Sequence, residues 1–353
     1  MIIQYANTSF RMRDYSETFK LLTQFKKLAG ITRLADLTHL DYTGLPVYTA
    51  IRPKAKSLTT SQGKGLTKEA AQCSALMESI EVYFAEELIP DVIGKSEFEL
   101  NQDKTPFIPV NHLAKSVRFT SPLQKFNWVN AKLVLSGETV LSPFAEYSLD
   151  SYLPEVLIYS PDTTGLAGGN NYNEALLHGI LEVIERQDAQ HEHELVSVNS
   201  DLVKIISDSF EYAINFQENN YGIPTFEVLL KSKNPFENQI LFKGSGCHLN
   251  KTIALNRAIT EAIQSRVTTI AGSRDDLVDT KYDLDANEFP LAINEKIFSE
   301  VFDYPVETID EALFVLYEKI KENNQDILVY TYYDKEICIL KVKLISKDLI
   351  SHV

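Results

Sequence analysis

The sequence has little cysteine, no long apolar run and no signal-like start. Its three cysteines, Cys73, Cys247 and Cys338, form no CxxC pair and no zinc pattern, so we interpret them as buried or semi-buried free thiols. No apolar run reaches the ~18–20 residues that a membrane-spanning helix needs, which excludes a membrane role by this criterion. The first residues lack the charged-then-apolar layout of a secretory signal, and we therefore expect a cytoplasmic protein.

Basic residues are also in the minority, with 34 against 49 acidic ones and a net charge of −15. A negative electrostatic field disfavours binding to the phosphate backbone of DNA or RNA, so we expect no nucleic-acid partner. An anionic small ligand remains compatible with this charge, because a nucleotide pocket needs only a few local cations and a metal ion. The 353 residues, 44% of them hydrophobic, suffice for a large core in one big domain or two modest ones.

Helix and strand signals are mixed along the chain, which predicts an α+β or α/β class; we favour α+β. Thr67 is a plausible N-cap of a strong helix, and Ser136-Gly137 marks the turn of a hairpin. We find no low-complexity tract or linker, which favours one composite domain over residues 1–353. The expected helices are 15–28, 67–88, 174–188, 251–272 and 309–323, and the expected strands include 223–232, 238–249, 326–333 and 337–345.

Three of these helices share a pattern. The windows AQCSALMESIEV from Ala71, ALLHGILEVIER from Ala175 and ALNRAITEAIQS from Ala254 can be aligned. Each has Ala, three variable residues, a small residue, Leu or Ile, a variable residue, Glu, a variable residue, Ile, and Glu or Gln. Such a pattern should start by chance at about one position in a million. We infer a pseudo-repeat of three helices, packed on mixed β-sheet, with a shared structural role.

The repeat places carboxylates in pairs. Residues three apart on a helix share a face, so Glu78 points with Glu81, and Glu182 with Glu185. A single such pair is usually a solvated face. Where several acidic faces converge, however, the clustered charge requires a counter-ion, and Mg²⁺ suits carboxylate oxygens and recruits substrate phosphates. The repeat therefore favours a magnesium site.

Cations suited to phosphate flank these helices. Lys64 lies between two glycines ahead of a helix N-terminus, where free N–H groups and the helix dipole favour anions. The GGNN loop stands in the same relation to the second helix, although GKG lacks the spacing of a Walker A loop. We interpret His178 and His248 as structural histidines. The arginines predicted to lie near the acidic faces are Arg186, Arg257, Arg266 and Arg274.

Three blocks resemble the signatures of the YcaO-domain family. They are SQGKGLTKEAAQCSALMESIE (61–81), GLAGGNNYNEALLHGILEVIERQD (165–188) and GSGCHLNKTIALNRAITEAIQSRVTTIAGSRDDL (244–277). The family branch associated with TfuA partners is the most similar one in three segments: SALMESIE, IPTFEV and GCH…RDDL. The resemblance implies a single large YcaO domain, with signature blocks at about 61–277, a small N-terminal segment 1–55 and a C-terminal α/β segment 278–353.

The resemblance also implies an activity. Family members use ATP and Mg²⁺ to phosphorylate the oxygen of a peptide backbone amide after a nucleophile has added to its carbon. External sulfide gives a backbone thioamide, and a neighbouring Cys, Ser or Thr side chain gives an azoline. The Mg²⁺ ligands implied are Glu78, Glu81, Glu182 and Glu185. The residues implied to line the ATP pocket are Lys64, Ser74, Asn170, Glu174, Arg186, Gln264 and Arg266, to which the charge pattern adds Arg257.

Two departures from the family pattern affect the expected partners. The first block often reads ExxER, whereas Val82 follows Glu81 here. No proline-rich C-terminus and no long N-terminal recruiting segment are visible, so we expect a separate TfuA-like or E1-like partner, a peptide or protein substrate, and a homodimer. Thioamide formation is our first hypothesis. The alternatives are an azoline-forming cyclodehydratase and a non-catalytic nucleotide-binding scaffold.

Overall fold

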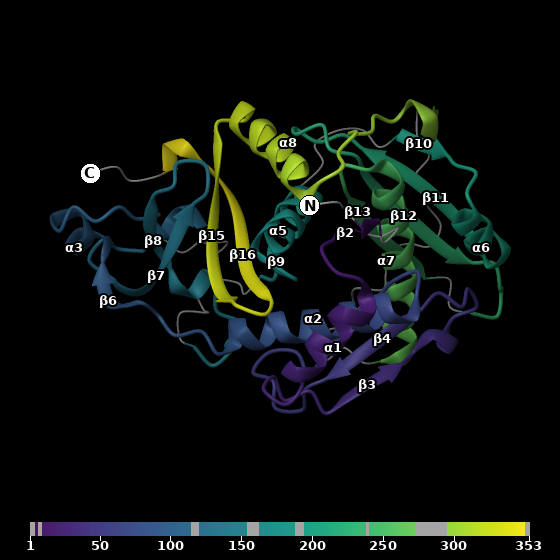
Figure 1. Cartoon of the computed structure of the whole chain (residues 1–353), viewed down its shortest axis with the longest axis horizontal. Coiled ribbons are helices and arrows are strands. Elements are labelled where there is room, and N and C mark those ends of the chain that lie inside the picture. Colours follow the sequence, from purple (N-terminus) through teal and green to yellow (C-terminus); the bar gives the residue numbers. More distant parts are fainter. Residues whose placement is uncertain are drawn as a thin grey trace. The chain divides into compact units, whose positions relative to one another are not determined.

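Figure 1 shows the computed structural model of the chain. Its elements divide into two compact units, each assembled from separate stretches of sequence. Unit 1 comprises Met1–Pro53, Leu58–Ser79 and Ile184–Ala312, and unit 2 comprises Lys54–Ser57, Ile80–Val183 and Leu313–Val353. The structure describes residues 4–5, 9–113, 120–153, 162–187, 194–237, 240–272 and 295–349.

A five-stranded sheet forms the core of unit 1. Its strand order is β13-β12-β11-β10-β14, in which β10 pairs with β14 in parallel and the other pairs are antiparallel. The register of β11 and β12 runs from Phe210↔Ser232 to Gln217↔Thr225. The bounds are β10 (Glu194–Ser197), α6 (Asp201–Ser209), β11 (Phe210–Gln217), β12 (Thr225–Ser232), β13 (Leu241–Cys247) and β14 (Glu295–Ile297).

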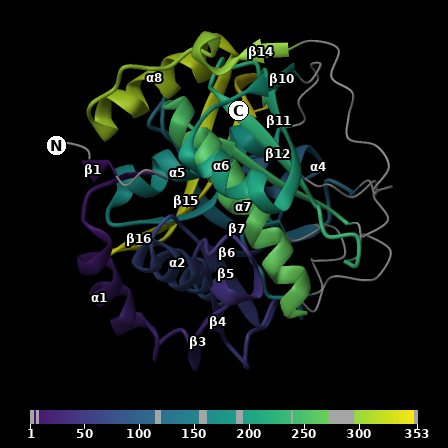
Figure 2. The ribbon, with the colours of Figure 1, turned by 90° about the vertical axis from the view of Figure 1, so that its right-hand side faces the viewer.

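Helix α7 (Lys251–Ala271) packs along β12 and β13 (Figures 1 and 2). Asn250 caps its start by accepting the N–H of Ile253, and Gly272 ends it in a left-handed conformation. Its alanines and isoleucines are buried against Phe226 and Phe242 of the sheet. This apolar contact fixes the helix along the edge strand β13, and its polar side chains are left at that edge.

Smaller elements complete unit 1. The three-stranded antiparallel sheet has the order β3-β4-β5, and α7 also contacts β5. Asp14 caps α1 by accepting the N–H of Glu17. The bounds are β1 (Gln4–Tyr5), β2 (Phe10–Arg11), α1 (Tyr15–Phe25), β3 (Arg33–Asp36), η1 (Thr38–Leu40), β4 (Val47–Ile51), β5 (Thr60–Lys64) and η5 (Phe298–Glu300).

A six-stranded sheet organises unit 2. The order is β6-β7-β15-β16-β9, with β8 paired to β7. Trp128 and Tyr147 are fully buried within this unit. The bounds are β6 (Val92–Ser96), α3 (Glu97–Gln102), α4 (Val110–Leu113), β7 (Lys125–Leu133), β8 (Thr139–Pro143), η2 (Phe144–Glu146), β9 (Leu166–Gly169), β15 (Gln325–Asp334), β16 (Cys338–Ser346) and η6 (Lys347–Leu349).

Three helices belong partly to each unit. Helix α2 (Lys68–Glu86) starts in unit 1 and ends in unit 2, whereas α5 (Tyr172–Arg186) and α8 (Ile309–Glu322) straddle the division in other places. All the predicted helices are present, and the Thr67 hydroxyl accepts the N–H of Ala70, as its predicted capping role requires. The mixed α+β class is therefore confirmed. Arg274 and the end of the third signature block lie outside the described residues.

Each helix of the repeat follows a strand, and glycine allows the strand to approach it. A Cβ on Gly63 of β5 would lie 2.0 Å from the Ala75 nitrogen and 2.3 Å from the Ala71 oxygen. A Cβ on Gly246 of β13 would lie 2.1 Å from the Ala254 oxygen. Gly63 and Gly246 occupy the same position relative to the first alanine of their windows. In the first and third windows, the correspondence therefore extends to the preceding strand and its glycine contact, whereas the equivalent position before Ala175 is Ala167.

We predict that Gly63→Ala and Gly246→Ala each destabilise the fold by about 1–3 kcal/mol or more, because the added methyl group overlaps the helix backbone. Gly137→Ala is the control: its φ of +81° makes alanine unfavourable, but no atom of the described residues lies within 4 Å of the new Cβ. We expect the control to cost about 1 kcal/mol. Urea denaturation followed by circular dichroism measures all three, and equal effects would contradict the close-approach explanation.

Candidate functional site

The edge strand β13 brings two glutamates together in unit 1. Because no strand pairs with its outer side among the described elements, the N–H groups on that side need other acceptors. The Cys247 N–H donates to Glu185 Oε2 at 2.9 Å, and the Ser245 N–H lies 3.4 Å from Glu261 Oε1. Glu185 comes from the end of α5, and Glu261 from α7. We call Glu185 and Glu261 the carboxylate pair.

Three cations surround the carboxylate pair. Lys64, at the end of β5, forms an ion pair with Glu261. The Nη2 atom of Arg257 lies 3.9 Å from Glu185 Oε2, one turn before Glu261 on α7. Arg186, the last residue of α5, acts on both carboxylates through its charge. Five charged groups from three elements, β5, α5 and α7, therefore meet at one strand edge.

The two carboxylates have opposite pKa shifts. Burial raises the pKa of Glu185, and the neighbouring charge of Glu261 raises it further, although Arg257, Lys64 and Arg186 act in the other direction. Burial acts in the same direction on the half-buried Glu261, but the charge and hydrogen bond of Lys64, with the charges of Arg186 and Arg257, outweigh it and lower the pKa of Glu261. In the absence of a further cation, Glu185 therefore takes up a proton at a higher pH than an ordinary glutamate does, and Glu261 at a lower pH.

A second predicted pair meets at the start of α5 in unit 2. Asn170 Nδ2 lies 3.1 Å from both carboxylate oxygens of Glu174. Asn171 Oδ1 accepts the N–H of Glu174 at 2.9 Å and so caps the helix. Asn170 and Glu174 are 4% and 2% exposed, so the pair is a buried polar group at a helix N-terminus.

The four predicted Mg²⁺ ligands are distributed over both units: Glu78 and Glu185 in unit 1, Glu81 and Glu182 in unit 2. Glu78 is exposed, Glu182 is half-buried, and Glu81 and Glu185 are each 8% exposed. Among the described residues, no group of three or more His, Cys, Asp or Glu side chains is arranged to hold a metal ion by itself. The convergence of the four therefore stays a prediction.

The chemistry of the carboxylate pair fits a nucleotide with its metal ion. Mg²⁺ is usually held by one or two carboxylates and completes its coordination with phosphate oxygens and water. Glu185 supplies such a carboxylate, while Lys64, Arg186 and Arg257 suit phosphate oxygens. The site-residue assignments of Ser74 and Gln264, both half-buried, are neither supported nor opposed by a described contact of their side chains.

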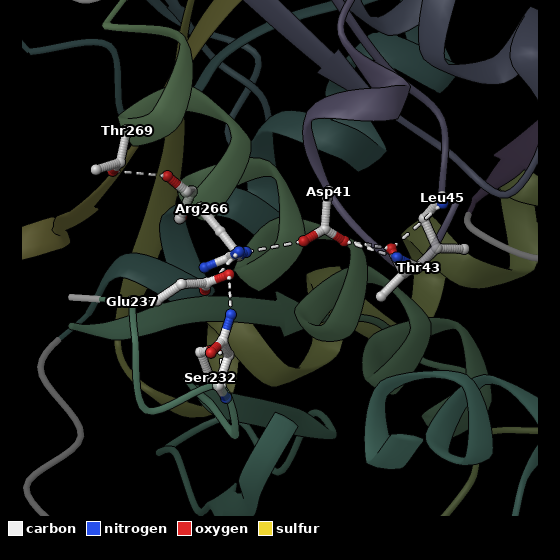
Figure 3. Close-up of polar contacts among 9 residues, drawn as sticks. Asp41, Thr43, Leu45, Ser232, Glu237, Arg266 and Thr269 are labelled. Atoms are coloured by element: carbon white, nitrogen blue, oxygen red, sulfur yellow. Dashed lines mark hydrogen bonds and ion pairs between the residues drawn. The ribbon is translucent and has the colours of Figure 1, made fainter. Parts of the chain in front are cut away.

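Arg266 has a different environment from the other predicted cations (Figure 3). Its Nε donates to Asp41 Oδ1 at 2.8 Å, and its Nη2 lies 3.0 Å from Glu237 Oε2. The Thr43 hydroxyl holds the other oxygen of Asp41 at 2.6 Å. Arg266 is 5% exposed and also lies over the rings of three aromatic residues: Tyr42, Phe210 and Phe242. This guanidinium links α7 to the loop after η1 and to the segment between β12 and β13.

Glu261, Asp41 and Glu237 were not among the residues selected from the sequence. Glu261 did carry a signal, since it is the glutamate of the third repeat window, but its partner Lys64 is 197 positions away. Asp41 and Glu237 have no such signal, because their common partner Arg266 joins them only through tertiary structure.

Comparison with known proteins identifies the family. The family model described as YcaO cyclodehydratase, ATP- and Mg²⁺-binding, matches residues 62–346. The chain belongs to the YcaO family. ATP and Mg²⁺ are the cofactors of this family, and the match includes all the predicted site residues.

Relatives of the YcaO chain are found in several bacteria. An uncharacterized protein of Mycobacterium tuberculosis is 33% identical over 298 residues, which are 79% of this chain and 66% of the relative. The chain thus covers slightly less than two thirds of that relative's length. A protein of Rhizobium leguminosarum bv. trifolii, encoded in the tfuA 3′ region, is 31% identical over 74% of this chain and 67% of its own length.

Solved structures share the fold at lower identity. YcaO from Methanopyrus kandleri, bound with AMPPCP and Mg²⁺, has a TM-score of 0.76 at 18% identity and covers 97% of this chain and 93% of its own. A heterocyclase in complex with substrate and cofactor has a TM-score of 0.74 at 18% identity, and the match covers 95% of this chain and 52% of the heterocyclase chain. A chain of the E. coli microcin synthetase McbBCD complex has a TM-score of 0.64 at 16% identity, and the match covers 89% of this chain and 87% of the other. At these sequence identities, the similarity shows that this chain has the same fold as the solved structures.

In the YcaO chain, none of the described helices combines the length and apolar character that crossing a bilayer requires.

We predict that Arg266→Ala lowers the free energy of unfolding by about 3–5 kcal/mol, because it leaves the buried Asp41 carboxylate without its cation. Lys319→Ala is the control: it removes an exposed ion pair with Glu322 and should cost less than about 1 kcal/mol. Urea denaturation measures both. If Arg266→Ala instead weakens ATP binding without loss of stability, the predicted role in the ATP pocket is supported over the anchoring role.

We predict that Glu185→Gln stabilises the ligand-free protein at pH 7. Glutamine keeps an acceptor for the Cys247 N–H and removes the ionisable group whose charged form is disfavoured by burial. Because the pKa of Glu185 is raised above its ordinary value of 4.5, wild type loses stability as the pH rises from 4.5 through the folded-state pKa. The advantage of the variant should therefore shrink as the pH falls towards 4.5.

Thermal unfolding at several pH values tests this second prediction, with the exposed Glu322→Gln as the control. A lower stability of Glu185→Gln at pH 7 would show that the attraction of Arg257 outweighs burial and would contradict the prediction.

Proposed function

We propose that this YcaO protein uses ATP and Mg²⁺ to activate a peptide backbone amide and convert it to a thioamide, with a TfuA-like partner. The observation that carries the proposal is the carboxylate pair with its three cations, within a chain of a family described as ATP- and Mg²⁺-binding. The substrate is a ribosomally made peptide or a larger protein. A heterocyclase in complex with substrate and cofactor shares the fold, which supports a substrate of the kind that heterocyclases modify.

The atoms of the proposed reaction balance. Sulfide, as HS⁻, adds to the amide carbon, and the carbonyl oxygen attacks the γ-phosphorus of ATP. An O–P bond forms, and the bond from the γ-phosphorus to ADP breaks. The C–O bond then breaks, so that amide, HS⁻ and ATP become thioamide, ADP and hydrogen phosphate. Phosphorylation is required because hydroxide is a poor leaving group, whereas phosphate is a good one.

The chain's own residues would position the substrates and stabilise the charge of the transferring phosphoryl group, and they would form no covalent bond with either. Lys64, Arg186 and Arg257 bind phosphate oxygens, and Asn170 with Glu174 holds the start of α5 for the nucleotide. Glu78, Glu81, Glu182 and Glu185 hold Mg²⁺, which when bound neutralises the triphosphate. Ser74, Gln264 and Arg266 complete the proposed ATP pocket. Lys64 must leave Glu261 to reach a phosphate, and Glu185 must be ionised to hold a cation.

The choice of thioamide over azoline depends on gene neighbourhood. A relative at 31% identity is encoded in the tfuA 3′ region, which supports a TfuA-like partner and sulfide as the nucleophile. The alternative is a cyclodehydratase that acts on Cys, Ser or Thr with an E1-like partner. It is favoured by the family's description and by the heterocyclase with the same fold.

A non-catalytic nucleotide-binding scaffold is the third candidate. It is favoured by Val82, which is 8% exposed and occupies the position where the family often has arginine. We also propose a homodimer and a single cooperative domain over residues 1–353. Light scattering and a single unfolding transition, respectively, test these two proposals.

We predict that ATP hydrolysis depends on the target peptide and falls at least about 100-fold in Glu78→Ala and Glu182→Ala. The exposed Glu69→Ala on the same helix as Glu78 is the control and should retain activity. The assay uses the purified chain, its TfuA-like neighbour, peptides encoded beside its gene, and sodium sulfide. Phosphate release that neither substitution changes would contradict the proposal.

Mass spectrometry of the peptide separates the three candidates. Exchange of oxygen for sulfur adds about 16 Da, and loss of water on ring formation removes about 18 Da. A thermal shift with Mg²⁺ and AMPPCP, without a mass change for any nucleophile, would support the scaffold.

A further inference from the structure

His248 lies at the end of β13, next to the carboxylate pair, and is not used by the proposed reaction. It directly follows Cys247, whose N–H donates to Glu185. Its ring is 1% exposed and meets the ring of Phe10 edge to face, with 4.5 Å between the centroids. Phe10 belongs to β2, so His248 is enclosed between this short strand and the start of α7.

The hydrogen bonds of His248 define its protonation. Nδ1 accepts the N–H of Asn250 at 3.0 Å, so the proton of the neutral ring is on Nε2. Burial, and then the charges of Arg257 and Arg11, lower the pKa of His248 to about 3, and the ring is neutral at physiological pH. The Nε2–H is thus a neutral donor on the ring edge opposite Asn250, and it is buried without an acceptor among the described residues.

Arg257 has a second donor of the same kind. Its Nη2 end faces Glu185 at 3.9 Å, but its Nε is buried and has no acceptor among the described residues. The Cβ atom of Arg257 lies against Gly246, since a Cβ added to Gly246 would be 2.8 Å from it. Gly246 is two residues before His248. Arg257 of α7 and His248 therefore both lie at the C-terminal end of β13, and the charge of Arg257 acts on His248.

Two buried donors without acceptors are unusual, and they destabilise the fold. More than nine tenths of buried polar groups are hydrogen-bonded, and an unsatisfied buried donor costs about 1–3 kcal/mol. The positive charges of Arg257 and Arg11 also act on this place. Neutral and charged N–H donors of this type together match the oxygens of an anion, since guanidinium groups bind tetrahedral oxyanions through parallel N–H groups.

We propose that the Nε2–H of His248 and the Nε–H of Arg257 form a binding site for a tetrahedral oxyanion, with Arg11 contributing positive charge. This inference rests on the proposed function for the identity of the anion. The phosphoryl group that is transferred to the amide oxygen, and then released as inorganic phosphate, is the tetrahedral oxyanion which that reaction generates. His248 is thus a further phosphate-binding residue, next to the carboxylate pair.

The test uses inorganic phosphate as the probe and the full-length chain without nucleotide. Isothermal titration calorimetry should show saturable phosphate binding by wild type. His248→Asn keeps an acceptor near the Nδ1 position for the Asn250 N–H but removes the distal donor, and should bind phosphate about tenfold more weakly. His248→Gln places an N–H donor near the Nε2 position and should stay within about threefold of wild type.

Thr252→Ala, at an exposed position in the first turn of α7, controls for effects of the helix N-terminus and should bind phosphate as wild type does. Absence of saturable phosphate binding by wild type, or equal affinity in folded His248→Asn and wild type, would overturn the inference. If His248→Asn does not fold, Arg257→Lys gives the same test, because it keeps the charge and lacks the Nε–H.

Binding of Mg²⁺ with AMPPCP and peptide product formation are measured in parallel. Normal nucleotide binding and normal product with unchanged phosphate affinity in His248→Asn would refute the anion site and leave the proposed function intact. Weakened phosphate binding without any modified peptide would keep the anion site and refute the proposed reaction.

Discussion

The outer edge of β13 is the constraint on which the site depends. Its N–H groups have no strand partner among the described elements, and burial makes an unsatisfied donor costly. Glu185 and Glu261 accept these donors, which places two carboxylates from different helices side by side. Their mutual repulsion in turn requires the nearby cations Lys64 and Arg257. The charge cluster thus follows from the termination of a sheet.

The same edge explains how a stable fold can hold a reactive arrangement. Glu261 is paired with Lys64, and burial raises the pKa of Glu185, so an uncompensated charge is disfavoured there in the ligand-free protein. Binding of a metal ion and an anion would replace these internal pairs with external ones. His248 and Arg257 are the exception, because their buried donors have no internal acceptor among the described residues. An arrangement of this kind trades stability for binding.

Arg266 shows that the same residue type on the same helix can have very different contacts. It lies little more than one turn beyond Glu261 on α7, yet its two carboxylate partners and three aromatic neighbours tie it to loops. From the sequence alone, Arg186, Arg257 and Arg266 were equivalent candidates for phosphate contacts. Only burial and the position of Asp41 distinguish Arg266, because helical periodicity does not reveal what faces each side.

The sequence by itself determined the elements and the acidic repeat. Periodicity, caps and glycine positions predicted the helices of all three windows, the cap at Thr67 and the mixed class, because these features depend on residues close together in the chain. Which side chains meet was decided by tertiary structure. The Lys64–Glu261 ion pair joins residues 197 positions apart, and the Asp41–Arg266 ion pair joins residues 225 apart. Sheet order and the edge at β13 fix such contacts, and no local pattern encodes them.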